Sequence, residues 1–278
     1  MLTPPQFSTA LIGLGLIWVL ALWLRHSGPV VSGSISDALL WRGKEGGATN
    51  RSSDLIVYSY KETEEAKQNI EFFFRHALHN KADFIFMMNG EYTVEVPQLP
   101  NVRVVERENR CYDLGGYAEV LSANSTLTQA YSRFILLNAS LRGPFLPAWA
   151  SGTCWSDAYL DKLSQKTKLV GLSYNCLSGD VANQHIQSML MTTDSVGMEI
   201  LLANLQCYEN MSSAVHDGEE RITNWIRDSG YEVFAMTSNF AARGGAEDSR
   251  AYGETCGWDD VWFSDNYEGV SVHPYDTM

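Results

Sequence analysis

From residue 54 onward, short apolar runs alternate with longer segments whose apolar residues recur every three or four positions. Residues 62–79 and 111–122 have this second pattern, which is typical of helices with one buried face. The short runs are bounded by turn residues and predict strands at residues 54–60, 82–90, 101–108 and 133–137. Strands that alternate with helices over short connections predict an α/β domain with a mostly parallel sheet flanked by helices.

The pattern is less regular in the second half of the chain. Residues 149–159 are turn-rich and aromatic, and residues 185–192 (HIQSMLMT) fit either a strand or the start of a helix. From residue 241 the composition is typical of loop. We expect helices at residues 158–164, 195–205 and 217–229, the last closed by Gly230, and strands at residues 168–176 and 231–237.

Residues 7–24 (FSTALIGLGLIWVLALWL) are uncharged and almost wholly apolar, and they follow a short tail, residues 1–6. The run is near the lower limit for crossing a bilayer as a helix, so we interpret it as a single transmembrane anchor. A cleaved signal peptide is the alternative. The Gly- and Ser-rich residues 25–53 then form a stem, and residues 54–278 form the α/β domain.

Two observations bear on the orientation of the predicted anchor, and they favour opposite sides of the membrane. Arg25 follows the apolar run directly, which mildly favours a cytosolic domain under the positive-inside rule. Four Asn-x-Ser/Thr sequons, at Asn50, Asn124, Asn138 and Asn210, favour a glycoprotein in the lumen. Asn138 ends a predicted buried strand and is a poor glycan acceptor in either compartment.

Composition excludes some classes of function. The formal net charge of −13 and the lack of a basic stripe argue against a nucleic-acid partner. No Gly-x-Ser-x-Gly elbow and no phosphate-binding Gly-x-x-x-x-Gly-Lys-Ser/Thr loop occur, which argues against an α/β hydrolase and a P-loop nucleotidase. The five cysteines include no Cys-x-x-Cys pair, and the sequence leaves open up to two disulfides or buried free thiols.

Polar residues gather at two places that follow predicted strands. Asn109 and Asp113 precede the pair Gly115-Gly116, and Asn138-Ala139-Ser140 is followed by Arg142. Ligands bind outside the carboxyl ends of the strands in open α/β sheets, so these clusters predict a site for a sugar or a nucleotide. The alternative is structural: Asp113 caps a helix, the glycines allow close packing, and Asn138-Ala139-Ser140 is a turn or a glycan acceptor.

The order of YSRFILLNASLRGPF, a Val-Gly strand, HIQSMLMTTDSVG and DGEERITNWIRDSGYEVFAM resembles glycosyltransferases of the rhamnan-synthesis type and their membrane-anchored eukaryotic relatives. The resemblance covers about residues 55–236. It implies a GT-A-like, Rossmann-type sheet. It also implies transfer of a sugar from a nucleotide-diphosphate sugar to a glycan or glycoconjugate acceptor, in the lumen of the Golgi or the endoplasmic reticulum.

The resemblance also implies roles for residues on the donor side of the site. Ser59 and Tyr60 end the first strand, where the nucleotide lies. Arg142 neutralises the diphosphate in place of a metal, and the alternative for it is an exposed surface arginine. His185 hydrogen-bonds the donor diphosphate or binds a metal, and the alternative is a satisfied core histidine. The nucleotide or ribose side is lined by Asn109, Asp113, Gly115 and Gly116.

The remaining implied roles concern the metal and the general base. Asn138 and Ser140 stand where many such enzymes have an acidic pair that binds Mn²⁺ or Mg²⁺, and neither is charged, so a metal is doubtful. Glu219 matches the position of a helix-starting Gly-Glu and is the candidate general base, with Glu220 adjacent. The alternative for both acids is a favourable interaction with the helix dipole. The missing acidic pair also leaves open a non-catalytic protein that binds a glycan or a partner.

Overall fold

A computed structural model of the chain describes residues 52–123, 125–144, 152–175 and 183–236. The predicted anchor at residues 7–24, nearly all of the stem and the loop from residue 241 lie outside these ranges. Within the ranges, no helix combines the length and the apolar character needed to cross a membrane.

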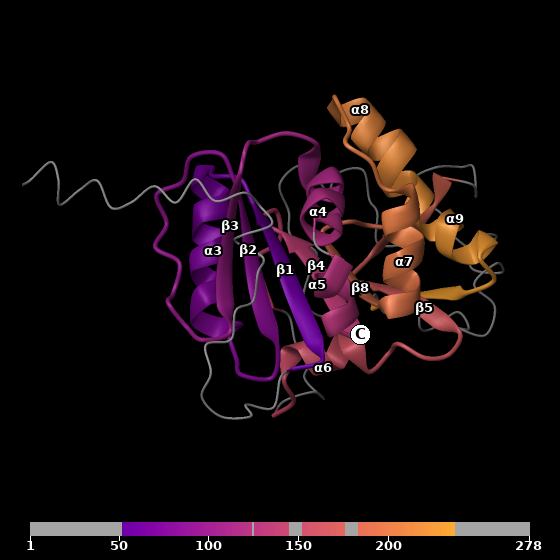
Figure 1. The fold of residues 1–278 in the computed structure, drawn as a ribbon, viewed down its shortest axis with the longest axis horizontal. Helices are drawn as coiled ribbons and strands as arrows, with labels where there is room; N and C mark the ends of the chain where they lie inside the picture. The colour runs from indigo at the N-terminus through magenta and orange to yellow at the C-terminus, as the bar shows by residue number, and fades with distance from the viewer. Residues whose placement is uncertain (1–51, 124, 145–151, 176–182, 237–278) are drawn as a thin grey trace, which may run out of the picture. The chain divides into compact units, whose positions relative to one another are not determined.

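The described part of the chain forms a seven-stranded sheet with the order β3-β2-β1-β4-β8-β5-β9 (Figure 1). Every neighbouring pair is parallel except those of β8, which runs antiparallel to β4 and to β5. The predicted mostly parallel α/β sheet is therefore confirmed. The strands are β1 (Asp54–Tyr60), β2 (Asp83–Asn89), β3 (Val102–Arg107), β4 (Arg133–Asn138), β5 (Thr167–Gly171), β8 (Leu190–Asp194) and β9 (Glu232–Ala235).

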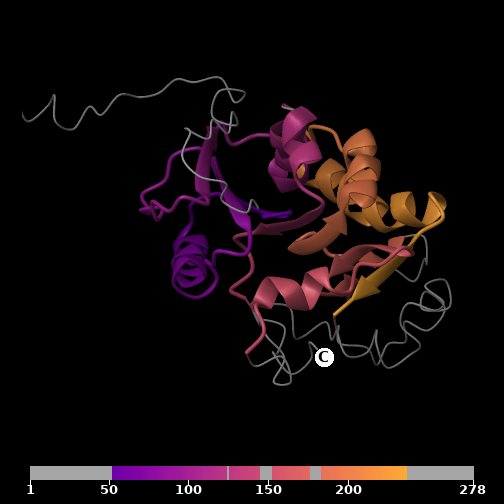
Figure 2. The same cartoon turned by 60° about the horizontal axis from the view of Figure 1, so that its bottom comes forward.

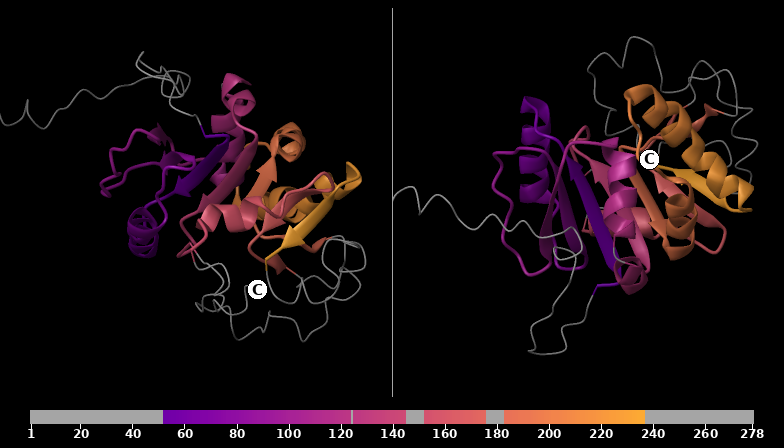
Figure 3. Two further views of the ribbon diagram at one scale, coloured as in Figure 1. Left: turned by 90° about the horizontal axis from the view of Figure 1, so that it is seen from below. Right: turned by 45° about the horizontal axis from the view of Figure 1, so that its top comes forward.

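Helices cover both faces of the sheet, as the turned views show (Figures 2 and 3). On one face, α3 (Glu64–His76) and α6 (Trp155–Leu160) pack with Ile56, Tyr58 and Phe86. Residues of the opposite face, such as Val57 and Met87, share a core with α4 (Tyr112–Ser122), α5 (Ser125–Ala130), α7 (Ser195–Asn204) and α9 (Glu220–Asp228). All residues of β1 and β2 are buried, which explains why both strands are continuous apolar runs.

The N-terminal half follows the predicted elements closely. Helix α3 is shorter at both ends than the predicted residues 62–79. It begins after Thr63, whose side chain caps it by accepting a hydrogen bond from the Ala66 N–H at 3.1 Å, and it ends at His76. Helix α5 was not predicted, since its sequence STLTQA has little apolar character.

The second half departs from the prediction at three places. The segment predicted as one strand at residues 168–176 divides into β5 and the short β6 (Tyr174–Asn175). Residues 185–192 contain β7 (His185–Ile186), which pairs with β6, and the start of β8. The segment predicted as a helix from residue 217 begins as α8 (Met211–Ser213), continues as a π-helix, η3 (Ala214–Glu219), and ends as α9.

Candidate functional site

A cleft of about 610 Å³ opens at the carboxyl edge of the parallel strands. The chain passes from β1 to β2 and β3 on one side, and β4 lies on the other side of β1, so the strand order reverses at β1 and β4. Ligands bind at such a reversal in open α/β sheets. The described lining comes from the ends of β1, β2 and β4, the starts of α3 and α4, and the α8–η3 segment.

The cleft brings together residues that are far apart in the sequence. Of the residues that the sequence analysis singled out, six belong to its described lining: Ser59, Asn109, Asp113, Asn138, Ser140 and Glu219. The two polar clusters therefore face the same space.

Asp113 and Asn138 form the centre of one wall. Asn138 Nδ2 donates to Asp113 Oδ2 at 2.6 Å, and Leu114 N–H donates to Asp113 Oδ1 at 2.9 Å. Asn138 Oδ1 in turn accepts a hydrogen bond from Ser140 N–H at 3.1 Å. Burial raises the pKa of the Asp113 carboxyl above its ordinary value, the nearby Glu219 adds to this increase, and the hydrogen bonds from Asn138 and Leu114 oppose it.

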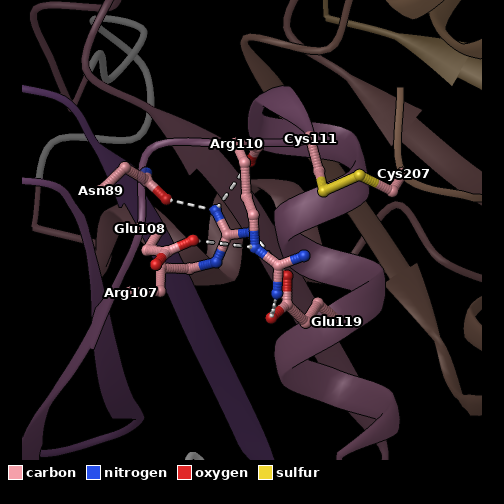
Figure 4. The surroundings of a disulfide bond; sticks show 7 residues. All are labelled: Asn89, Arg107, Glu108, Arg110, Cys111, Glu119 and Cys207. Atoms are coloured by element: carbon pink, nitrogen blue, oxygen red, sulfur yellow. Dashed lines mark hydrogen bonds and ion pairs between the residues drawn. A yellow bond between two sulfur atoms is a disulfide. The ribbon is translucent and has the colours of Figure 1, made fainter. Parts of the chain in front are cut away.

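A second polar network supports the floor of the cleft, and the sequence analysis did not identify it. Asn89 Nδ2 donates to Ser59 Oγ at 3.1 Å, and Arg107 donates to Asn89 Oδ1 at 2.6 Å. The Arg107 side chain is 1% exposed and pairs with Glu119 on α4 at 2.6 Å, and Glu119 also binds Arg110 (Figure 4). A buried charge needs such a partner, and the pairing holds Asn89 against Ser59.

Glu219 is the last residue of η3 and belongs to the described lining of the cleft. Its Oε1 accepts a hydrogen bond from the Ser188 N–H at 2.7 Å, which fixes the carboxylate at the cleft. The preceding Gly218 allows the close approach of the Tyr208 ring, because a Cβ there would lie 2.8 Å from that ring. Glu220, the adjacent acid, instead binds the exposed His216 at 3.0 Å and is absent from the described lining.

A disulfide joins Cys111 to Cys207 across the two walls (Figure 4). Cys111 precedes α4, and Cys207 precedes α8, whose Met211 lines the cleft. Cys111 and Tyr112 both have positive φ angles, 66° and 55°, which directs the chain from β3 into α4. The pairing that the sequence left open is thus assigned for these two cysteines, and Cys154 is free.

Five of the predicted donor-binding residues are absent from the described lining. Tyr60 is buried, and its hydroxyl donates to Glu62 at 3.2 Å. His185 is buried, and its Nδ1 lies 2.6 Å from the Asn183 carbonyl oxygen. Arg142 is exposed, and its guanidinium lies over the ring of Phe72, 5.1 Å from the ring centroid.

The other two are the glycines of α4, and both have a packing role. A Cβ at Gly115 would lie 2.7 Å from the carbonyl oxygen of Gln206, and one at Gly116 would lie 2.8 Å from Met87 Cε. These two positions therefore follow the structural alternative, in which the glycines allow close approach of neighbouring segments.

The described lining is acidic and offers a poor site for a metal. Glu65, Asp113 and Glu219 are its acids, and Lys61 is its cation. No three His, Cys, Asp or Glu side chains gather as a metal site within the described ranges. Both Asp113 oxygens and the Asn138 Oδ1 already accept hydrogen bonds from the protein. Asp113 is the single carboxylate of this pair, so the pair is a weaker donor set for Mn²⁺ or Mg²⁺ than two acidic side chains.

No protein-family model and no curated protein matches this sequence. Solved structures do match this chain, and two of them are as follows. One is a putative nucleotide-diphospho-sugar transferase from Desulfovibrio desulfuricans G20, with 12% identity, a TM-score of 0.40, and coverage of 66% of this chain and 78% of that chain. The other is the mannosyltransferase PcManGT from Pyrobaculum calidifontis in complex with GDP-Man and Mn²⁺, with 11% identity and a TM-score of 0.40. The match covers 67% of this chain and 55% of the mannosyltransferase. Likenesses at this level do not bear on the substrate or the activity of this chain.

Proposed function

We propose that the protein is a glycosyltransferase that binds a nucleotide-diphosphate sugar in the cleft and transfers the sugar to a hydroxyl of a glycan or glycoconjugate. The observation that carries the proposal is the position of the cleft. It lies where the strand order reverses, and its described lining combines hydroxyl, amide and carboxylate groups from separate elements. The ordered resemblance to glycosyltransferases of the rhamnan-synthesis type supports the same conclusion.

The cleft has groups suited to a nucleotide sugar. Asn109 and Ser140 line it with exposed amide and hydroxyl groups suited to hydrogen bonds with ribose and sugar hydroxyls. Lys61 lies just before helix α3 at the same edge, and its ammonium group favours the negatively charged diphosphate, whereas the acids of the first turn of α3, Glu64 and Glu65, oppose it. No divalent metal is part of this proposal, because Asp113 and Asn138 offer one carboxylate where such sites often have an acidic pair.

Glu219 is the proposed general base. The acceptor oxygen attacks the anomeric carbon and forms a new C–O bond. The bond from that carbon to the diphosphate oxygen breaks, and the nucleoside diphosphate leaves with the electron pair. The carboxylate of Glu219 takes the acceptor proton, and its hydrogen bond with Ser188 N–H holds it in position for this step.

A matched pair of variants tests this role. We expect Glu219→Gln to reduce sugar transfer by about 10²–10⁴-fold with donor affinity little changed, because an amide does not accept the proton. Glu220→Gln is the control, since Glu220 is absent from the described lining and pairs with His216. The measurement is transfer of radiolabelled sugar from the nucleotide sugar that binds, to a panel of glycans.

The result of this assay also separates catalysis from binding alone. Equal rates for the two variants would refute the role of Glu219. If the native protein binds a nucleotide sugar saturably but neither transfers the sugar nor slowly hydrolyses the donor, a non-catalytic protein that binds a glycan or a partner is favoured.

The proposal includes a location in the lumen of the Golgi or the endoplasmic reticulum, with residues 7–24 as a single membrane anchor. The Cys111–Cys207 disulfide supports an oxidising compartment, where such bonds persist. Protection of the α/β domain from protease in intact microsomes, lost when detergent is added, is the expected result. Cleavage without detergent would contradict this location.

A further inference from the structure

Asn210 begins an exposed segment at the rim of the cleft and heads the sequon Asn210-Met211-Ser212. All three residues of the sequon are exposed, and Met211 is 63% exposed. Met211 also belongs to the described lining of the cleft, so Asn210 stands directly beside the cleft opening. The acceptor triplet is therefore presented at the surface.

The hydrogen bonds of Asn210 use its oxygens. Its side-chain Oδ1 accepts from the Ser213 N–H at 3.0 Å and caps α8, and its main-chain oxygen accepts from Ser213 Oγ and Ala214 N–H. An N-linked glycan is attached to Nδ2, so glycosylation leaves the capping oxygen in place. The local structure of α8 is thus compatible with a modified Asn210.

The sequon at Asn138 differs from that at Asn210, because its amide nitrogen is already hydrogen-bonded and part of the triplet is buried. Asn138 Nδ2 donates to Asp113 Oδ2 at 2.6 Å, and the next residue of the sequon, Ala139, is only 7% exposed. Asn138 also lines the cleft itself. A glycan at this position would remove one hydrogen from the amide that binds Asp113 and would fill the cleft.

The disulfide gives an independent reason to expect glycosylation chemistry. Cys207, three residues before Asn210, is bonded to Cys111, which is 96 residues away in the sequence. Disulfides between distant segments form and persist in oxidising compartments, and the secretory pathway is where N-glycosylation acceptors are modified. The bond and the sequon therefore agree on the environment in which this segment folds.

We propose that Asn210 carries an N-linked glycan and that Asn138 carries none. In the reaction, Nδ2 of Asn210 attacks the anomeric carbon of an oligosaccharide that is activated as a lipid-linked diphosphate. An N–C bond forms, the bond between that carbon and the diphosphate oxygen breaks, and the amide loses one proton to a base of the transferring enzyme. The proposal does not depend on the sugar-transfer activity of the cleft.

Peptide mapping of the full-length chain, expressed in a eukaryotic host, tests the proposal. Enzymatic release of N-glycans converts each modified Asn to Asp, so mass spectrometry distinguishes the two sites directly. We expect conversion at Asn210 and none at Asn138. Asn210→Gln and Ser212→Ala should each abolish modification of the segment, whereas Ser212→Thr should retain it, because Thr preserves the sequon.

Two outcomes would overturn the proposal. An unmodified Asn210 in the folded, disulfide-bonded native protein is one, and a glycan on Asn138 in that same material is the other. Quantitation of the Cys111–Cys207 peptide in each sample verifies that the chain has folded in an oxidising compartment. Donor binding, measured separately by calorimetry, tests the proposed function and leaves this result unaffected.

Discussion

Asp113 links the two walls of the cleft electrostatically. It accepts hydrogen bonds from Asn138 and Leu114 on its own wall, and the Glu219 carboxylate on the other wall adds to the increase in its pKa. The folded state therefore holds the proton of Asp113 to a higher pH than the unfolded state does. A ligand that neutralises or hydrogen-bonds this carboxyl changes its proton affinity, so ligand binding and the ionisation of Asp113 are coupled.

The raised pKa of Asp113 predicts a particular pH dependence of stability. Between its ordinary value of 3.8 and the higher folded value, the native state binds more protons than the unfolded state, so the stability contributed by this group falls as pH rises. Asp113→Asn has no titrating carboxyl at this position, so its stability does not fall with pH for this reason. We expect the free energy of unfolding of the variant, relative to the native protein, to increase through this window and to level off above it.

Urea denaturation at a series of pH values measures this difference. Asp217→Asn is the control, because Asp217 is an exposed acid that precedes Gly218. A stability difference between Asp113→Asn and the native protein that does not change with pH would contradict the assigned burial effect.

At the scale of elements, the disulfide determines how the α8–η3 segment is held against α4. The bond closes a loop with a sequence separation of 96 residues, and loops of this size gain substantial stability from a cross-link. Cys207→Ser is expected to lower the free energy of unfolding by about 2–4 kcal/mol and to weaken donor binding, because Met211 and Glu219 lie on the released segment.

Cys154→Ser is the matched control, since Cys154 is a free thiol in the structure. Thermal unfolding with and without a dithiol reductant should separate the two variants. Reductant should lower the melting temperature of the native protein and of Cys154→Ser, and leave that of Cys207→Ser nearly unchanged. Equal sensitivity of all three proteins would show that the bond does not hold the segment.

The two glycines of α4 offer a second comparison between elements. Gly115→Ala places a Cβ against the main chain of Gln206, which does not move easily, and we expect a loss of about 1–3 kcal/mol. Gly116→Ala meets the flexible end of Met87 and should cost less. Chemical denaturation of both variants measures the difference. A larger loss for Gly116→Ala would contradict this account of the packing.

At the scale of the whole molecule, the sequence predicted the strands β1 to β4 and the common edge at which two polar clusters meet. Strands β1, β2 and β4 were predictable because they are almost wholly buried and are mostly apolar, whereas the partly exposed β3 was predicted from the turn residues that bound it. The π-helix η3 was not predicted, because its residues Ala214–Glu219 have no local pattern that distinguishes a π-helix from an α-helix.

The supporting network of the cleft was missed for a related reason. Arg107 reads as an exposed charge at the end of a strand, and only the fold brings Asn89 and Glu119 to it. Arg142 shows the reverse case, since it directly follows a polar cluster yet packs over Phe72 on α3. Chain proximity did not predict which side chains point into the cleft.

The central claim is that the cleft binds a nucleotide-diphosphate sugar. Isothermal titration of the purified chain with a panel of UDP-, GDP- and dTDP-sugars tests it most directly, with and without a chelator. We expect saturable binding of one of these donors. Ser140→Trp should abolish it by filling the cleft, whereas Ser122→Trp, at the exposed end of α4, should bind as the native protein does. No binding by the native protein to any donor, or binding that Ser140→Trp retains, would contradict the account.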